Sequence, residues 1–277
     1  MAAALQDLKV QKGDRVAIIS KNCAQWIIAD LAIMMVGAIS VPLYPTQSDD
    51  SMTYVLQHSG ASLVFVGKLD NPQHIQNIIP HTIKQVGFNY AGVKAPLMWN
   101  DLITKHAPIN NPYHPTLSDT FTIVYTSGTT GHPKGVVHDF AGASFAATHG
   151  VQEFNLDQNN HSMSFLPLAH IAERVLVELP SIYAGFTVSF TESLDTFAED
   201  LRLVSPTRFF SVPRLWTKFQ MGILEKMPQK KLNILLSIPL VNTLVKKKIR
   251  QGLGLDNTTM FISGAAPLAV SVLEWFA

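Results

Sequence analysis

Short apolar runs along the chain alternate with longer segments in which apolar residues recur at helical spacing. The runs predict strands at residues 15–19, 39–43, 63–66, 122–125, 162–165, 187–190, 208–211 and 259–262. The helical spacing predicts helices at residues 24–36, 51–59, 71–79, 140–154, 171–184, 196–204, 213–225, 230–252 and from 268 onward. Because strands that alternate with helices form crossover units, the pattern predicts an α/β fold of mostly parallel sheets sandwiched by helices.

The most apolar segment, residues 26–44, has almost the length of a membrane span. It also contains Asp30, Gly37 and Pro42, and an ionised aspartate is costly inside a bilayer. The segment therefore favours a helix that is capped by Asn22 and ends near Val36, followed by a buried strand.

A change of composition divides the chain. Residues 87–118 are rich in Pro, Asn and His and predict a long connection between two α/β lobes. We therefore expect a first lobe at residues 1–117 and a second at residues 118–277.

The overall composition is that of a globular protein, with 47% apolar and 15% charged residues. The net charge of +1 provides no field that would attract nucleic acid. Cys23 is the single cysteine, so we expect no internal disulfide, a reducing, cytoplasmic compartment and a packing role for its side chain. The ten histidines do not have the spacing of zinc ligands.

The stretch "YTSGTTGHPKGVV" at residues 125–137 gathers glycines, small hydroxyls and one lysine. Glycines let backbone N–H groups turn toward a ligand, and Lys134 supplies a point charge suited to phosphate. We expect a strand before this loop and a helix after it, whose positive end would also attract an anion. The stretch predicts a phosphate-binding loop rather than a flexible surface loop. It departs from the common P-loop pattern, because Gly135 follows the lysine where Ser or Thr is required.

The same stretch resembles the signature loop of the AMP-forming adenylating enzymes, the superfamily of acyl-CoA synthetases, peptide-synthetase adenylation domains and luciferases. In that family the loop holds the pyrophosphate part of ATP while a carboxylate attacks the α-phosphate. The resemblance implies that Thr126 also helps to bind Mg²⁺, and that Thr126 and Lys134 take part in catalysis. The residues that it implies around the triphosphate are Thr126, Ser127, Gly128, Thr129, Thr130, Gly131 and Lys134.

Further segments resemble the same family. Residues 10–46 are similar to its N-terminal opening, and "SFLPLAHIAERV" at 164–175 resembles a core motif that would make His170 a catalytic neighbour of the acyl pocket rather than a structural histidine. Residues 195–219 resemble long-chain fatty acid–CoA ligases in particular, although ordinary packing also accounts for this segment. The loop within "MFISGAAPLA" is a plain turn or, by resemblance, contacts adenine and the acyl carboxylate through Ser263, Gly264, Ala265, Ala266 and Pro267.

The resemblance implies a long-chain fatty acid–CoA ligase that uses ATP, Mg²⁺ and coenzyme A. It also implies that the chain corresponds to about the first half of such an enzyme, is impaired alone and leaves an apolar face where a dimer is expected. The alternatives are a non-catalytic nucleotide- or acyl-binding remnant and an adenylating enzyme for another carboxylic acid. Residues 230–252 combine apolar and basic side chains, which suits either a solvated helix face or contact with an anionic membrane surface, and Pro239 favours a break there.

Overall fold

The computed structural model describes residues 1–126 and 131–277. The chain forms two compact units, Met1–Gly150 with Pro167–Leu179, and Val151–Leu166 with Pro180–Ala277. This division differs from the boundary predicted between residues 117 and 118. The physical reason is the pairing of Ser40 with Thr122, whose buried hydroxyls lie 3.0 Å apart and tie the chain beyond residue 118 to the first sheet.

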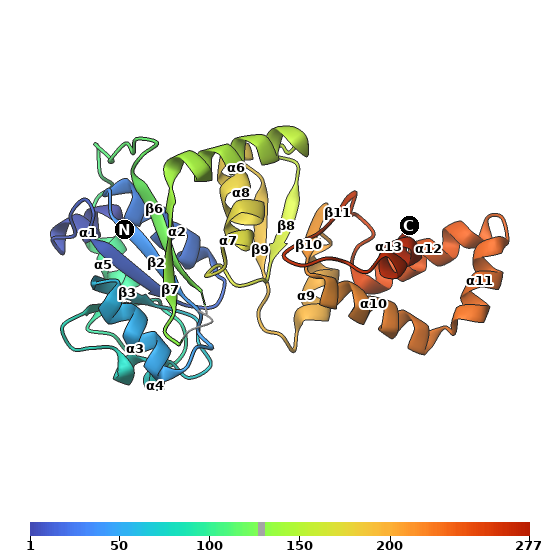
Figure 1. Ribbon diagram of the computed structural model, residues 1–277, viewed down its shortest axis with the longest axis horizontal. Coiled ribbons are helices and arrows are strands. Elements are labelled where there is room, and N and C mark those ends of the chain that lie inside the picture. The colour runs from blue at the N-terminus through green and yellow to red at the C-terminus, as the bar shows by residue number, and fades with distance from the viewer. Residues whose placement is uncertain (127–130) are drawn as a thin grey trace. The chain divides into compact units, whose positions relative to one another are not determined.

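The first unit is built on a seven-stranded sheet (Figure 1). All neighbouring strands are parallel except the last pair. In sheet order they are β5 (Leu97–Met98), β4 (Lys84–Gly87), β3 (Ala61–Val66), β1 (Arg15–Ile19), β2 (Ile39–Leu43), β6 (Thr120–Thr126) and β7 (Lys134–Asp139).

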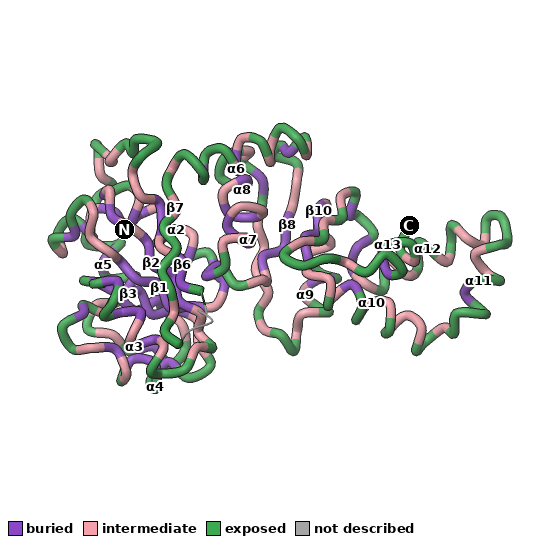
Figure 2. Tube along the Cα trace, viewed as in Figure 1, coloured by how far each residue is buried: buried purple, intermediate pink, exposed green. Residues whose placement is uncertain are grey.

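Helices cover both faces of this sheet because its central strands are apolar on both sides. Val64 and Val66 pack with the helices α3 and α4, whereas Phe65, from the opposite face, contacts Trp99 of α5. Figure 2 shows the buried residues gathered along β1, β2 and β3. The helices of this unit are α1 (Ala2–Asp7), α2 (Ala24–Met35), α3 (Asp49–His58), α4 (Pro72–Ile78), α5 (Trp99–Lys105), α6 (Phe140–Glu153) and α7 (Ile171–Glu173), which continues as a π-helix (Arg174–Glu178).

The second unit has a four-stranded parallel sheet and its own core around Phe209 and Trp216. In sheet order the strands are β11 (Met260–Ser263), β10 (Arg208–Ser211), β8 (His161–Ser164) and β9 (Thr187–Phe190). The helices are α8 (Leu179–Ala184), α9 (Phe197–Val204), α10 (Pro213–Lys226), α11 (Gln229–Ser237), α12 (Val241–Leu253) and α13 (Val270–Phe276).

The mostly parallel α/β fold predicted from the sequence is confirmed, and several local predictions are corrected. The connection predicted at 87–118 contains β5 and α5, because apolar Leu97 and Trp99 return to the sheet. Cys23, not Asn22, is the N-cap of α2; the Asn22 amide oxygen instead accepts a hydrogen bond from the backbone N–H of Leu168 at 3.0 Å.

The most apolar segment and the most basic segment are each divided. Residues 26–44 form most of α2 and then β2, as predicted. Residues 230–252 form parts of α11 and α12, with the expected break beside Pro239. Among the helices that the structure describes, none has both the length and the apolar character needed to cross a bilayer.

Candidate functional site

Two of the predicted site residues face each other at the end of a β-hairpin. Thr126 is the last residue of β6, and its register partner is Lys134, the first residue of β7. Both residues are exposed. Because directly opposed residues on antiparallel strands have neighbouring Cβ atoms, the two side chains leave the hairpin next to each other.

The helix predicted at residues 140–154 is present as α6, but it does not follow the loop directly. The chain instead turns back as β7, because Val136 and Val137 pair with Val124 and Ile123 across the hairpin. Helix α6 begins at Phe140, after β7, so its positively polarised N-terminus does not directly follow the loop. Ser127, Gly128, Thr129 and Thr130 lie outside the described residues, and their predicted roles stay predictions.

The described end of the loop shows why it needs glycine. Gly131 is exposed and has φ +115°, a backbone conformation that side-chain-bearing residues rarely adopt. A Cβ at Gly135 would come within 2.9 Å of Ile123 Cγ2 and 3.1 Å of the Tyr125 ring. Glycine at position 135 therefore lets the two strands pair without such a clash, and its register partner on β6 is Tyr125.

A column of rings connects the loop to α3. The His132 ring stacks on Tyr54 with a centroid distance of 4.6 Å, and Tyr54 stacks on His58 at 5.1 Å. His58 Nδ1 lies 2.8 Å from the Tyr125 hydroxyl in a hydrogen bond. Sequence reasoning missed this support, although the i, i+4 spacing of Tyr54 and His58 indicates that the two rings share a helix face.

His170, predicted to lie beside an acyl pocket, is the N-cap of α7. Its Nδ1 accepts a hydrogen bond from the backbone N–H of Ala172 at 3.1 Å, and the residue is exposed. The preceding loop is held to the start of α2 through Leu168 and Asn22. The predicted role of His170 next to substrate remains a prediction.

A buried charge cluster follows His170 in the same unit. Arg174 donates to Asp30 of α2 at 2.5 Å and to Glu178 at 2.9 Å, and all three side chains are closed to solvent. The guanidinium lies 4.2 Å from the centre of the Phe121 ring on β6. Burial is the largest cause that raises the pKa of Glu178, the nearby Asp30 also raises it and Arg174 lowers it, and together they bring this pKa to about 8. The sequence analysis used Asp30 only as an argument against a membrane span.

The predicted loop at residues 263–267 belongs to the second unit. Ser263 pairs with Ser211, and the N–H of Gly264 donates to the Ser211 carbonyl at 3.2 Å. Ala265 has φ +64°, a strained conformation for a residue with a Cβ. The structure thus brings Thr126 and Lys134 together and places this loop in the other unit.

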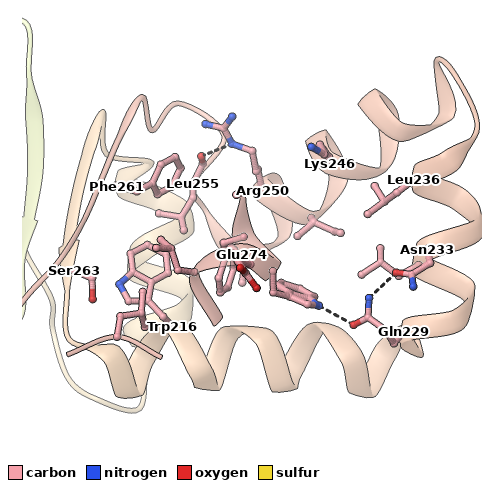
Figure 3. Close-up of a pocket in the computed structure, with 18 of the residues that line it drawn as sticks. Trp216, Gln229, Asn233, Leu236, Lys246, Arg250, Leu255, Phe261, Ser263 and Glu274 are labelled. Atoms are coloured by element: carbon pink, nitrogen blue, oxygen red, sulfur yellow. Dashed lines mark hydrogen bonds between the residues drawn. The ribbon is translucent and has the colours of Figure 1, made fainter. Parts of the chain in front are cut away.

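The second unit contains a cavity of about 770 Å³ between α10, α11, α12 and α13. Figure 3 shows Trp216, Leu255 and Phe261 at one part of it and Leu236 and Asn233 at another. Most lining residues are apolar, and Ser263 of the 263–267 loop is among them. Its volume falls in the range of small-molecule sites in proteins. Such a cavity suits a largely apolar ligand.

An α/β unit that carries a loop rich in glycine and threonine is typical of proteins that bind the phosphates of a nucleotide. The family model described as AMP-binding enzyme matches residues 1–277. The chain therefore belongs to the family of AMP-binding enzymes.

Curated relatives carry ligase names. The chain is 29% identical to a long-chain-fatty-acid–CoA ligase of Mus musculus, over 99% of this chain and 48% of that protein. It is 28% identical to a long chain acyl-CoA synthetase of Arabidopsis thaliana, over 96% of this chain and 46% of that protein. The chain thus spans about half the length of these relatives.

Solved structures share the fold. The adenylation domain of a carboxylic acid reductase from Segniliparus rugosus, in complex with AMP and a co-purified carboxylic acid, matches with a TM-score of 0.77 and 20% identity. That match covers 99% of this chain and 48% of the other. An O-succinylbenzoate–CoA synthetase from Bacillus subtilis in complex with AMP matches with a TM-score of 0.70 and 21% identity, over 99% and 48% of the two chains. These likenesses establish the architecture.

Proposed function

We propose that this chain takes part in AMP-forming ligation of a long-chain fatty acid to coenzyme A. In the first step the fatty acid carboxylate attacks the α-phosphate of ATP, forming an acyl-adenylate and releasing pyrophosphate. In the second step the thiol of coenzyme A attacks the acyl carbonyl, and AMP leaves. The curated relatives named above support this reaction class.

The hairpin supports binding of the ATP triphosphate. Lys134 brings a positive charge to the mouth of a loop whose backbone turns at Gly131, and Thr126 offers an exposed hydroxyl beside it. Mg²⁺ is commonly held by one or two protein oxygens together with the phosphates of its nucleotide. A hydroxyl next to a cation fits this arrangement, so Thr126 is the proposed protein ligand and Mg²⁺ would supply charge neutralisation at the phosphates.

The cavity of the second unit is the observation that carries the substrate class. Its wall is largely apolar, with Trp216, Leu232 and Phe261 among the lining residues, and Ser263 brings the predicted carboxylate-binding loop to its edge. Burial of methylene groups in such a space stabilises a long acyl chain with each added carbon. A small aryl or amino acid would leave most of this wall without contact.

ATP binding tests the nucleotide assignment. Calorimetric titration of the chain with ATP and Mg²⁺ is expected to show binding that Lys134→Ala weakens by about tenfold to a hundredfold, the usual effect of losing a hydrogen bond to a charged group. Lys105→Ala, at an exposed lysine on α5 of the same unit, is the matched control and should bind like the unchanged chain. Equal affinities for all three proteins would refute the role of Lys134.

Isotope exchange between pyrophosphate and ATP tests the acid in the enzyme that contains this chain. Exchange is expected with palmitate and not with benzoate. Leu236→Trp, which narrows the cavity, should reduce exchange with palmitate more than exchange with octanoate. Exchange with benzoate alone would assign another acid, and the absence of exchange with every acid would remove the ligase proposal.

A further inference from the structure

The helices α11 and α12 form a hairpin, and its inward face lines the cavity of the second unit. They lie side by side in the second unit and are joined by a short turn at residues 238–240 (Figure 1). Residues at helical spacing on each helix line the cavity: Gln229, Leu232, Asn233 and Leu236 on α11, and Lys246, Ile249, Arg250 and Leu253 on α12. The remaining side chains of the hairpin point elsewhere.

Large apolar side chains occupy the outward face and the tip. Ile234 is 63% exposed, Leu244 is 62% exposed and Leu240, in the turn, is 82% exposed. Ile238 at the tip is also exposed. Figure 2 shows the hairpin as mostly exposed or intermediate, and none of the residues of α12, all of which the structure describes, is buried. The fold itself gains little from these apolar groups, which makes them candidates for contact with a partner.

Leu240, in the turn at the tip of the hairpin, has a strained backbone conformation. Leu240 has φ +66°, a conformation that glycine and asparagine adopt far more easily than leucine. A strained residue whose side chain points into solvent has no evident folding role. Its chemistry suits an apolar environment outside the chain.

Positive charge follows the same outward face. Residues 227–255 contain six Lys and Arg residues and no Asp or Glu. Arg250 is engaged inside the unit, donating to the carbonyls of Leu255 and Thr258, and Lys246 lines the cavity. The other four are all exposed and stand three or four residues from an exposed apolar side chain: Lys230 and Lys231 from Ile234, and Lys247 and Lys248 from Leu244. Lys247 also lines a small pocket with Arg250 and Asp256.

We propose that the tip and outward face of the α11–α12 hairpin are a docking surface for an anionic lipid bilayer. Apolar side chains ringed by lysines match a surface with an acyl interior and negatively charged headgroups. A nucleic acid would use the lysines but would leave Ile234, Leu240 and Leu244 without a role. The inference stands apart from the proposed ligase activity, because the test below contains neither ATP nor fatty acid.

Vesicle sedimentation with the full 277-residue chain tests the charged part. Binding is expected to vesicles of phosphatidylcholine with phosphatidylserine, to be weaker on phosphatidylcholine alone, and to fall with added salt. The double variant Lys247→Gln, Lys248→Gln should lower the partition coefficient by about thirtyfold, since each lysine near an anionic surface contributes roughly a fivefold factor. The control Lys94→Gln, Lys105→Gln removes the same charge from exposed sites of the first unit and should bind like the unchanged chain. Equal loss in both double variants would refute a local docking surface.

The apolar part is tested at the tip and by a fluorescent reporter. Leu240→Asn keeps a residue that tolerates positive φ, so the fold is expected to persist while vesicle binding falls about tenfold through lost apolar burial. Because Cys23 is buried, a cysteine introduced by Leu244→Cys can be labelled selectively with an environment-sensitive dye. Vesicles should shift its emission to the blue, whereas the same dye at Ile103→Cys on α5 should not respond.

Three outcomes would overturn the proposal. One is that the chain binds neither the anionic vesicles nor the vesicles of phosphatidylcholine alone. The second is binding in which the dye at position 244 stays in water. The third is that the Lys247→Gln, Lys248→Gln variant binds vesicles like the unchanged chain but loses binding to a polynucleotide. That result would assign the surface to nucleic acid.

Discussion

Asp30, Arg174 and Glu178 place two carboxyl groups and one guanidinium where water does not reach. One cation cannot balance two buried anions, so the lower-energy arrangement keeps a proton on Glu178. The cluster joins α2 to the π-helix that follows His170, and its cation lies against Phe121 of β6.

The raised pKa of Glu178 predicts a pH-dependent stability. Between its ordinary value of 4.5 and about 8, the folded chain binds this proton more strongly than the unfolded chain, so the free energy of unfolding falls as pH rises through that window. Glu178→Gln keeps the hydrogen bond from Arg174 without a titrating group. It should therefore unfold with a flatter pH profile, the difference from the unchanged chain growing by a few kcal/mol across the window.

Urea unfolding at several pH values measures this difference. Glu153→Gln, at an exposed position of α6, is the control and should follow the unchanged chain. If Glu178→Gln and the unchanged chain have parallel profiles, Glu178 is ionised in the folded state and the charge argument is wrong.

At the scale of elements, the β6–β7 hairpin presents Lys134 by its own construction. Its pairing register sets Lys134 opposite Thr126, and Gly135 opposite Tyr125 lets the strands approach under the aromatic ring. The Tyr125 hydroxyl forms a hydrogen bond with His58 of α3. The His58 ring stacks on Tyr54, and Tyr54 stacks on His132 of the loop. The loop is therefore supported from a helix distant in the sequence.

Gly135→Ala should damage this hairpin without touching the lysine. The new Cβ would lie 2.9 Å from Ile123 Cγ2, so we expect a loss of about 1–3 kcal/mol in the free energy of unfolding and weaker ATP binding. Gly150→Ala is the matched control, because no atom lies within 4 Å of its Cβ and helix α6 should gain about 0.5–1 kcal/mol. Chemical denaturation and calorimetry measure both effects. Unchanged stability and ATP affinity in Gly135→Ala would contradict the role given to this glycine.

At the scale of the whole molecule, the two units differ in how much of their secondary structure is buried. The strands β1 and β3 of the first unit consist largely of fully buried apolar residues, whereas α11 contributes only Leu232 to the buried set and α12 contributes none of its residues. Local opening costs least where few apolar contacts are lost. Motion is therefore expected at the helical hairpin and rigidity at the first sheet.

Hydrogen exchange read by mass spectrometry tests this expectation. Peptides from residues 229–253 should exchange well before peptides from β1 and β3. Anionic vesicles should slow exchange in the hairpin while leaving the first sheet unchanged, if the docking surface is correct. Protection of α12 as strong as that of β1 would contradict the burial argument.

Much of the fold was predictable because its signals are local. Apolar runs such as "VAII" and "LVFV" lie within β1 and β3, where each strand is recognisable from its own residues. The end of α2 before Gly37, which has φ +74°, and the break beside Pro239 follow from the backbone chemistry of single residues. The family followed from the loop at residues 125–137, whose composition few other folds require. Beyond these segments, local pattern left several outcomes open.

By itself the sequence determined the α/β class, most strand and helix positions, and a loop rich in groups that bind phosphate. Only the tertiary structure decided that "KGVVHD" forms a strand that pairs with β6, that Asp30 meets Arg174 across 144 residues of chain, and that residues of α10 to α13 line a largely apolar cavity. Periodicity encodes which side of an element is apolar. It does not encode which distant element will cover that side, because that choice depends on packing and charge balance summed over the whole unit.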